Sequence, residues 1–423
     1  MNIEILNTGT ELLLGSVINT HLAFFGEALF GLGLRIARQS CVPDGPPIGE
    51  ALQESFRRGA DVVLATGGLG PTSDDITRDL VAQLLGRELR EDAGILSDIR
   101  AKFAKFGRKT INPNIARQAQ VPAGAQVLYN HHGTAPGLYV PAGKDAAGAP
   151  TPHLFLLPGP PREMRPMFSE QVLPILKSLL PAAETPPGLR LYRLVGIGES
   201  AVEEQVGEAL AALGGGLEIG YCARSGEVDL RLIGEESLLA RAEAIVVPAL
   251  QKYLVSSRGE SLEQVIVRLL REQKKTLAVA ESCTGGLLAH RLTNVTGASD
   301  AFPAGLTTYI DPIKTKLLGV APETIAQDGG AVSAPVASAM AAGVRQIAGT
   351  DYALSTTGFA GPDGGREGKP IGTIFIGLAT PGRAEPLVKR MFFPTTDRET
   401  FKYRATQAAF DLLRRELIGQ GEP

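Results

Sequence analysis

Asp-Val-Val-Leu-Ala-Thr-Gly-Gly, at residues 61–68, is a nearly continuous apolar run that ends in a glycine turn. Such a run is typical of a strand buried on both faces of a parallel sheet, and DITRDLVAQLLG (75–86), just after it, has the apolar spacing of a helix. NIEIL (2–6), LRIARQSCV (34–42) and LFLLPG (154–159) predict further strands separated by helical segments. This alternation predicts βαβ units with a parallel sheet.

The same alternation returns after residue 261, where TLAVAES (276–282) predicts a strand and GGLLAHRLTNV (285–295) the helix that follows it. Between the two α/β regions, LRLYRLVGIG (189–198) predicts a strand and LEIGYCARSGEVDLRLIG (217–234) a hairpin. We therefore expect an α/β protein with two three-layer α/β domains, each with a mostly parallel sheet, joined by a small α+β module. The expected bounds are 1–180 for the first domain, 188–255 for the module and 261–420 for the last domain.

The composition is that of an ordinary globular protein. Of 423 residues, 44% are hydrophobic and 21% are charged, which excludes wholesale disorder. The net charge of -3 provides no basic footprint, so we expect neither direct nucleic-acid binding nor attachment to a membrane. Cys41, Cys222 and Cys283 lie far apart with no CxxC pair, so no disulfide framework or structural zinc is expected. The sequence shows no signal peptide, and we expect a cytoplasmic protein.

The stretch Glu-Ser-Cys-Thr-Gly-Gly (281–286) lies where a predicted strand ends and the next helix begins. Ser282 would therefore lie at the carboxyl end of the strand. Backbone N–H groups around Thr284, Gly285 and Gly286 would point to the same place and suit either a phosphate or an oxyanion. Ser282 is a candidate nucleophile, and the simpler alternative is a serine that caps the helix.

A serine nucleophile needs a base, and here a lysine is the better candidate. His290, the histidine nearest to Ser282 in sequence, would point away from the strand end. Tyr309 ends the next predicted strand and Lys314 falls in the first turn of the helix after it, so both could meet Ser282 at the sheet edge. Burial can keep a lysine neutral enough to accept a proton, although the lysine could also simply be solvated. Cys283 is a competing nucleophile, because a helix start can stabilise a thiolate; we favour Ser282.

A second glycine-rich loop, Thr-Gly-Gly-Leu-Gly-Pro-Thr (66–72), follows the strand of the opening stretch. Glycines there let the backbone approach a phosphate closely. Asp74 and Asp75, at the start of the next helix, could hold a divalent cation or could simply cap that helix. The candidate ligand contacts of this loop are Gly67, Gly68, Gly70 and Thr72.

Several longer motifs resemble the CinA (competence/damage-inducible protein A) family. AESCTGG, TYxxxxK, AVS, TGFAGP, PIGT and the closing DR…R helix are similar to its carboxy-terminal domain, which also occurs alone as a nicotinamide mononucleotide amidohydrolase. TGGLGPTSDD, NHHGTAPG and LPGPPREM resemble its molybdopterin-binding-like amino-terminal domain. The resemblance covers essentially the whole chain.

This resemblance implies a pyridine-nucleotide salvage enzyme. The carboxy-terminal domain would hydrolyse the carboxamide of nicotinamide mononucleotide to nicotinate mononucleotide and ammonia, without a cofactor. The amino-terminal domain would be a divalent-metal ADP-ribose pyrophosphatase, and the protein would be a homodimer. The implied amidase residues are Ser282 as nucleophile, Lys314 as its base, Tyr309 as a support to both, and Thr357, Gly358 and Arg398 as nucleotide contacts.

Two alternatives stay open at this point. The amino-terminal domain could bind a pterin or a nucleotide without catalysis, which an assay of metal-dependent phosphate release would separate from hydrolysis. The chain could also be a non-catalytic interaction protein of DNA uptake or damage response, which a salt-dependent binding titration would test. The middle module lacks a basic GxxG loop, so we favour a structural role for it over nucleic-acid binding.

Overall fold

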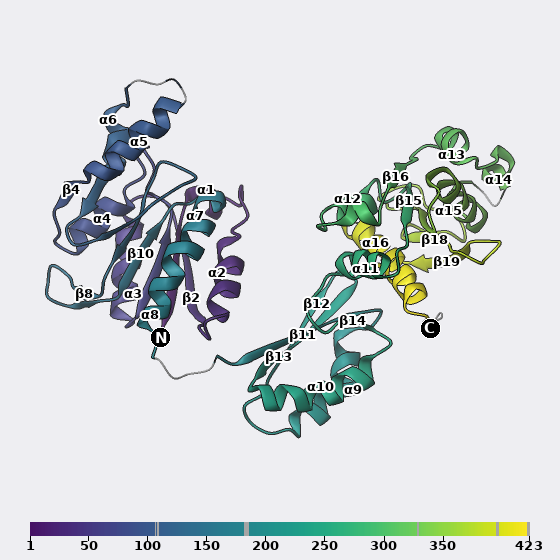
Figure 1. Ribbon diagram of the computed structural model, residues 1–423, viewed down its shortest axis with the longest axis horizontal. Coiled ribbons are helices and arrows are strands. Elements are labelled where there is room, and N and C mark those ends of the chain that lie inside the picture. The colour runs from purple at the N-terminus through teal and green to yellow at the C-terminus, as the bar shows by residue number, and fades with distance from the viewer. Residues whose placement is uncertain (106, 108–109, 182–185, 328–329, 395–396, 421–423) are drawn as a thin grey trace. The chain divides into compact units, whose positions relative to one another are not determined.

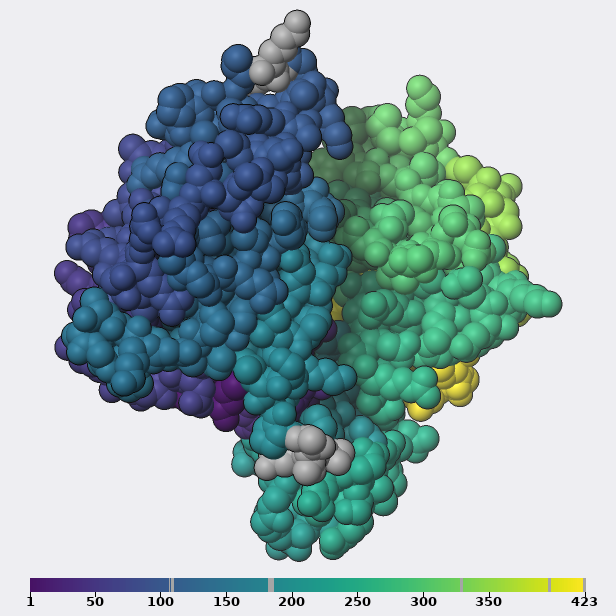
Figure 2. All heavy atoms as spheres, turned by 60° about the vertical axis from the view of Figure 1, so that its left-hand side comes forward, coloured from purple at the N-terminus to yellow at the C-terminus, as the bar shows by residue number. Residues whose placement is uncertain are grey.

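The structure is a computed structural model, and it describes residues 1–105, 107, 110–181, 186–327, 330–394 and 397–420. The chain divides into two compact units, residues 1–186 and 187–423 (Figure 1). With all heavy atoms drawn, each unit is a closely packed body (Figure 2). Among the described helices, none combines the length and the apolar character needed to cross a membrane.

The first unit is built on a six-stranded sheet with the strand order β2-β1-β3-β10-β7-β6. The first four strands are parallel, and β7 and β6 are antiparallel to their neighbours. Asn7 of β1 and Leu157 of β10 both pair with Thr66 of β3, so the carboxyl ends of these three strands lie together. The strand bounds are β1 Ile3–Thr8, β2 Ile36–Val42, β3 Val62–Thr66, β6 Gln126–Leu128, β7 Gly137–Val140 and β10 His153–Leu157.

Helices cover both faces of this sheet and bury one apolar cluster on each. One face carries α2 (His21–Phe30), α7 (Pro161–Met167) and α8 (Leu173–Leu179); the other carries α3 (Pro47–Arg57), α4 (Thr77–Leu84) and α5 (Ala93–Lys105). The three-layer α/β architecture predicted from the sequence is therefore confirmed. The shorter elements are α1 (Thr10–Leu13), β4 (Leu89–Glu91), α6 (Pro113–Ala116), η1 (Arg117–Ala119), β5 (Gln120–Pro122), β8 (Gly143–Lys144), β9 (Pro150–Thr151) and η2 (Phe168–Val172).

The apolar spacing of VINTHLAFFGEALFGLG (17–34) predicts one helix over the whole stretch, but the helix in the structure is shorter. It begins at His21, whose N–H donates to Asn19 Oδ1 at 3.0 Å, and it ends at Phe30. Gly33, with a φ of 73°, allows the chain to turn back toward β2. Local hydrogen bonding before the helix and a glycine after it thus override the apolar spacing.

In the second unit, residues 188–256 form an antiparallel sheet with the order β12-β13-β11-β14. The predicted hairpin forms, with Arg224 paired to Glu227 across the turn. Strand β14 was not predicted; it adds a fourth strand beside β11. The elements are β11 (Gly188–Val195), α9 (Glu199–Ala211), β12 (Glu218–Arg224), β13 (Glu227–Gly234), α10 (Glu236–Leu250) and β14 (Leu254–Ser256).

The rest of the second unit is a three-layer α/β domain on a sheet with the order β16-β15-β17-β18-β19. Strands β16, β15 and β17 are parallel, whereas β18 and β19 are antiparallel additions at one edge. The strands are β15 (Leu277–Glu281), β16 (Ala304–Thr307), β17 (Tyr352–Gly358), β18 (Thr373–Ala379) and β19 (Leu387–Phe392). Helices α11 (Leu262–Glu272), α12 (Leu287–Thr293) and α16 (Arg398–Leu417) pack on one face; α13 (Asp311–Leu318) and α15 (Ala334–Ala348) pack on the other, and η3 (Ala298–Asp300) and α14 (Pro322–Ala326) are short.

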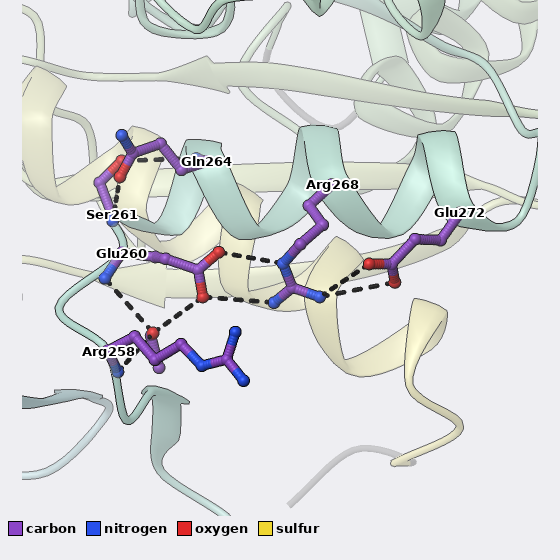
Figure 3. A network of polar contacts seen from close by, with 7 residues as sticks. Arg258, Glu260, Ser261, Gln264, Arg268 and Glu272 are labelled. Carbon is purple, nitrogen blue, oxygen red and sulfur yellow. Dashed lines mark hydrogen bonds and ion pairs between the residues drawn. The ribbon is translucent and has the colours of Figure 1, made fainter.

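A polar network fixes the connection between β14 and α11 (Figure 3). The Ser256 hydroxyl donates to the Glu260 carboxylate at 3.0 Å and accepts the Glu260 N–H at 3.3 Å. Arg268, two turns into α11, donates to the same carboxylate at 2.9 Å. Ser261 and Gln264 form a capping box at the start of α11. The connection is therefore held by side chains at both ends.

Candidate functional site

Ser282 lies at the carboxyl end of the second sheet, between the ends of β16 and β17. Its N–H donates to the Thr356 carbonyl at 3.0 Å, and on the other side the Thr308 N–H donates to the Glu281 carbonyl at 2.8 Å. Ser282 is 9% exposed, and within the described residues its hydroxyl has no hydrogen-bond partner. The side chain is thus held by its backbone and left available for chemistry.

Lys314, in the first turn of α13, is almost completely buried at 1% exposure. Its Nζ donates to the Tyr309 carbonyl at 3.1 Å and to Asp311 Oδ1 at 3.0 Å. Arg398, the first residue of α16, donates to the Tyr309 hydroxyl and to a backbone carbonyl of the neighbouring loop. Lys314 and Arg398 therefore both contact Tyr309, Lys314 at its backbone carbonyl and Arg398 at its hydroxyl. Among the described contacts Lys314 makes none to Ser282.

Thr357 and Gly358 end β17, on the other side of β15. The Thr357 hydroxyl donates to the Ala331 carbonyl at 2.8 Å and is buried, so it holds a neighbouring loop. Gly358 packs closely against β18, since a Cβ there would lie 2.7 Å from the Thr373 carbonyl oxygen. These two residues shape this edge of the site. The Thr357 hydroxyl already donates its hydrogen to a backbone carbonyl of the protein, so it cannot donate that hydrogen to a ligand.

The amide groups expected to be free at the start of α12 are largely occupied within the protein. The Glu281 carboxylate accepts the N–H groups of Gly286 at 3.0 Å, Leu288 at 3.0 Å and Ala289 at 2.9 Å. The Gly285 N–H donates to the Ser282 carbonyl at 3.2 Å. A carboxylate at a helix start is favourable, because it satisfies free donors and the helix dipole together. Positive charge to bind an anion at this site must therefore come from side chains elsewhere.

Thr284 is the third residue of this predicted set. It is completely buried, and its hydroxyl lies 2.7 Å from the hydroxyl of Thr356. Among the hydrogen bonds of the described residues, its N–H has no acceptor. The Thr284 amide therefore remains the candidate oxyanion donor beside Ser282.

Cys283 points into the apolar cluster beneath α12 and α16 and is 5% exposed. Burial raises the pKa of its thiol to about 12, so the thiol remains protonated at neutral pH. A protonated, buried thiol is a poor nucleophile. This observation supports Ser282 as the nucleophile and Cys283 as a packing residue.

The reactivity of the cysteines tests whether Ser282 or Cys283 is the nucleophile. If Ser282 is the nucleophile of an enzyme active site, Cys283→Ala should keep kcat within about threefold of wild type. In the native protein at pH 8, iodoacetamide should label exposed Cys222 much faster than Cys283, because only a thiolate attacks the reagent. Peptide mass spectrometry would measure both rates, and labelling in urea, where both should react, is the control. Rapid native labelling of Cys283, with loss of activity, would identify the thiol as the nucleophile.

Lys402 is a cation at this site that the sequence reasoning missed. It lies one helical turn after Arg398 on α16, and its Nζ is 3.4 Å from the position that a Cβ on Gly285 would take. Within the described part of the chain, neither Lys402 nor Arg398 has an acidic partner. The positive charge of Arg398 also partly offsets the raised pKa of the Cys283 thiol. Arg398 therefore lies close to the loop that contains Cys283 and Gly285. The four-residue spacing in Arg-Glu-Thr-Phe-Lys (398–402) is the signal that could have indicated a shared face.

A second candidate site is a cavity of about 370 Å³ in the first unit, where β1, β3 and β10 end. Ligands of open α/β sheets bind at this edge, outside the carboxyl ends of the strands. The cavity brings together five residues predicted from the sequence, namely Gly67, Gly68, Gly70, Asp74 and Asp75.

The glycine loop of this cavity has no space for side chains. Gly67 has a φ of 100°, and a Cβ on it would lie 2.4 Å from Thr8 Oγ1. Gly70 contacts Asp75, whose Oδ2 would lie 2.5 Å from a Cβ. The same oxygen accepts the Thr72 N–H at 2.9 Å and the Thr72 hydroxyl. Thr72 thus fixes Asp75 in the loop, and it is outside the residues that line the cavity.

Two buried polar atoms at the cavity wall favour a polar ligand. Thr8 and Gln118 line the cavity, and neither Thr8 Oγ1 nor Gln118 Oε1 has a partner within the part of the chain described. An unsatisfied buried polar group costs about 1–3 kcal/mol, which a ligand that bonds to it would recover.

The described residues contain no group of three or more His, Cys, Asp and Glu side chains placed to share one metal ion. Mg²⁺, however, is commonly held by one or two carboxylates together with phosphate oxygens of the substrate. Asp74 and Asp75 supply two carboxylates at the cavity. The site therefore fits an ion that binds together with a phosphorylated ligand.

The fold is that of a multidomain α/β protein with two separate candidate ligand sites at the carboxyl ends of its strands. Three family models match successive parts of the chain: the probable molybdopterin binding domain at 4–178, the damage-inducible protein CinA KH domain at 189–253 and the CinA C-terminal domain at 259–417. The chain belongs to the CinA family.

Relatives match over the full length. A CinA-like protein of Akkermansia muciniphila is 45% identical over 99% of both chains. A putative competence-damage inducible protein of Moorella thermoacetica is 42% identical over 100% of both. Among solved structures, a competence-damaged protein (CinA) superfamily protein from Klebsiella pneumoniae is 34% identical and covers 37% of this chain and 96% of its own, with a TM-score of 0.36.

Proposed function

We propose that the carboxy-terminal domain is a nicotinamide-nucleotide amidase that works through Ser282 and Lys314. The observation that supports this most directly is the arrangement at the sheet edge. A buried lysine and an unbonded serine hydroxyl follow neighbouring parallel strands, whose ends are joined by the bond from the Thr308 N–H to the Glu281 carbonyl. Serine and lysine together can perform acyl transfer without a metal.

In the proposed reaction, neutral Lys314 accepts the proton of the Ser282 hydroxyl, and Oγ attacks the carboxamide carbon of nicotinamide mononucleotide. The oxyanion is stabilised by the Thr284 N–H. The carbon–nitrogen bond then breaks, Lys314 returns its proton to the leaving nitrogen, and ammonia departs. Water attacks the acyl-enzyme, giving nicotinate mononucleotide and free Ser282. To reach Ser282, Lys314 must give up its contact with Asp311, whose half-exposed carboxylate can turn to solvent.

The direct test is to follow ammonia released from nicotinamide mononucleotide by the full-length protein, with and without a chelator. We expect release in both conditions, because no step of the amidase needs a metal. A protein that releases no ammonia under either condition would contradict the amidase proposal.

Within the same proposal, Arg398 and Lys402 bind the phosphate of the nucleotide. Both are cations without an acidic partner in the described chain, and the amides of α12 are satisfied by Glu281. Guanidinium and ammonium groups are the usual phosphate ligands of proteins.

For Lys402→Ala we expect KM for nicotinamide mononucleotide to rise at least about tenfold, with kcat changed less than about threefold, because the lost contact is to a non-reacting group. Lys402→Arg should restore most of the affinity. Nicotinamide riboside, which lacks the phosphate, should show little difference between wild type and variant. Exposed Lys316→Ala is the control and should behave as wild type. An equal loss for both substrates would exclude a phosphate contact.

For the amino-terminal unit we propose a metal-dependent ADP-ribose pyrophosphatase at the cavity of Gly67–Gly70. The glycine loop, the two unpartnered polar atoms and the carboxylates of Asp74 and Asp75 support a phosphorylated ligand with a divalent cation. A bound cation would neutralise negative charge on the phosphoryl oxygens. The chain's own part is to hold the ligand with its loop amides and to place the two carboxylates.

A further inference from the structure

A larger cavity, of about 610 Å³, lies inside the second unit, and none of its lining residues belongs to the proposed amidase site. One wall comes from the middle module, at the end of β11 and at the β12–β13 turn; the other comes from β19 and α16. Its volume is within the range of about 300–1,000 Å³ typical of small-molecule sites. The apolar part of its lining includes Val195, Val228, Met391, Phe393 and Leu412.

Direct contacts hold the two walls in place. Gln407 of α16 donates to the Glu227 carboxylate at 2.8 Å, and both side chains are buried. Arg414, three residues short of the end of α16, donates to the Leu254 carbonyl of β14 at 3.1 Å. The network around Ser256 fixes the connection between the same two parts (Figure 3). The cavity is therefore a preformed feature of one compact unit.

Charged side chains of both signs line the cavity: four cations, Arg224, Lys389, Arg404 and Arg415, and three carboxylates, Glu199, Glu227 and Asp411. Glu199 accepts the Ala223 N–H at 3.1 Å, and Glu227 accepts from Gln407. Arg415 pairs with Asp411 at 2.7 Å, and Arg224 pairs with Asp229, behind the wall, at 2.8 Å. Lys389 and Arg404 also line the cavity, and neither has a carboxylate partner in the part of the chain that is described.

The position of Arg404 adds a second element of recognition. Its guanidinium lies over the Phe393 ring, 4.7 Å from the ring centre, and Phe393 lines the cavity beside it. A cation on an aromatic face is still free to donate hydrogen bonds from its edge. Unpaired positive charge beside apolar and aromatic walls is complementary to an anion that carries an apolar body.

We propose that this cavity binds a small organic anion with an aromatic or aliphatic body. The anionic group would contact Lys389 and Arg404, and the body would pack against Phe393, Met391 and Val195. This site is independent of the amidase and pyrophosphatase sites and does not rest on either proposed activity.

The test uses two fluorescent probes of nearly the same shape on the full-length protein. 8-Anilinonaphthalene-1-sulfonate carries a negative charge, and N-phenyl-1-naphthylamine has the same rings without it. We expect the sulfonate to bind one site per chain. Lys389→Glu and Arg404→Glu should each weaken that binding at least about tenfold, and the neutral amine should change less than about twofold. Saturating nicotinamide mononucleotide should leave the sulfonate affinity unchanged.

Arg390→Glu is the matched control, because Arg390 follows Lys389 on β19 and is absent from the cavity lining. It should leave the affinity for both probes as in wild type. Lys389→Gln and Arg404→Gln, which remove charge without reversing it, keep the test decisive if a reversed charge unfolds the protein. Sulfonate affinity that is the same in all variants, or lost equally in Arg390→Glu, would overturn the proposal.

Discussion

Replacing Ser282 by alanine is expected to lower amidase turnover by at least about a thousandfold, and Lys314→Ala should lower it by about as much. The two residues act as one nucleophilic unit, and effects within such a unit are not additive. The double variant should therefore be little worse than either single variant. Steady-state ammonia release from nicotinamide mononucleotide, with substrate well above KM, measures all three.

Lys314→Arg separates a base from a mere charge at this position. Arginine keeps the positive charge but stays protonated at any working pH, so it cannot accept the serine proton, and we expect no rescue. The affinity of Ser282→Ala for nicotinamide mononucleotide, measured by calorimetry, should be close to that of wild type. Such a result would show that the substitution leaves the fold intact. Near-normal turnover in Lys314→Arg would refute the role of Lys314 as base.

In the amino-terminal unit, Asp75→Ala is expected to reduce ADP-ribose hydrolysis at least about a hundredfold and to leave ammonia release unchanged. Asp75 both accepts hydrogen bonds from Thr72 and presents a carboxylate to the cavity. Asp75→Asn distinguishes these roles, because an amide oxygen still accepts from Thr72 but carries no charge for a metal. Formation of AMP at fixed metal concentration measures both variants.

If Asp75 is a metal ligand, Asp75→Asn should be nearly as inactive as Asp75→Ala; if it only holds the loop, the asparagine variant should keep most activity. We expect the first result, and Asp74→Ala should show a similar but smaller loss. Asp98→Ala, at a partly exposed aspartate of α5 paired with Lys102, serves as the control and should be active. Loss of both enzyme activities in a folded Asp75 variant would contradict the separation of the two sites.

The structure could be predicted from the sequence alone wherever a single local pattern determines it. The continuous apolar runs at 62–65 and 277–280 predict buried parallel strands, and the structure confirms both as β3 and β15. The glycine turns that follow them fix where those strands end. The positions of Ser282 and of the loop at Gly67–Gly70 at sheet edges therefore follow from local sequence alone.

Features that depend on contacts between distant segments could not be predicted in this way. Lys402 follows Ser282 by more than a hundred residues, and only the packing of α16 brings its Nζ to the loop at Gly285. The Glu281 carboxylate accepts three backbone N–H groups only because its side chain turns toward the start of α12 at the end of β15. Strand β14 has three residues, too few for any periodic pattern, and it forms because β11 offers a free edge.

Helix α16 has a consequence for any attempt to produce the carboxy-terminal α/β domain as a fragment. Cutting before α11 would remove the middle module and leave Gln407 and Arg414 without their partners at Glu227 and Leu254. It would also uncover Leu412, which is 6% exposed in the intact protein, together with the rest of the apolar wall it belongs to. An uncovered patch of this kind promotes aggregation. A soluble fragment of this protein would thus either begin near residue 187 and keep the module, or carry polar replacements along this side of α16.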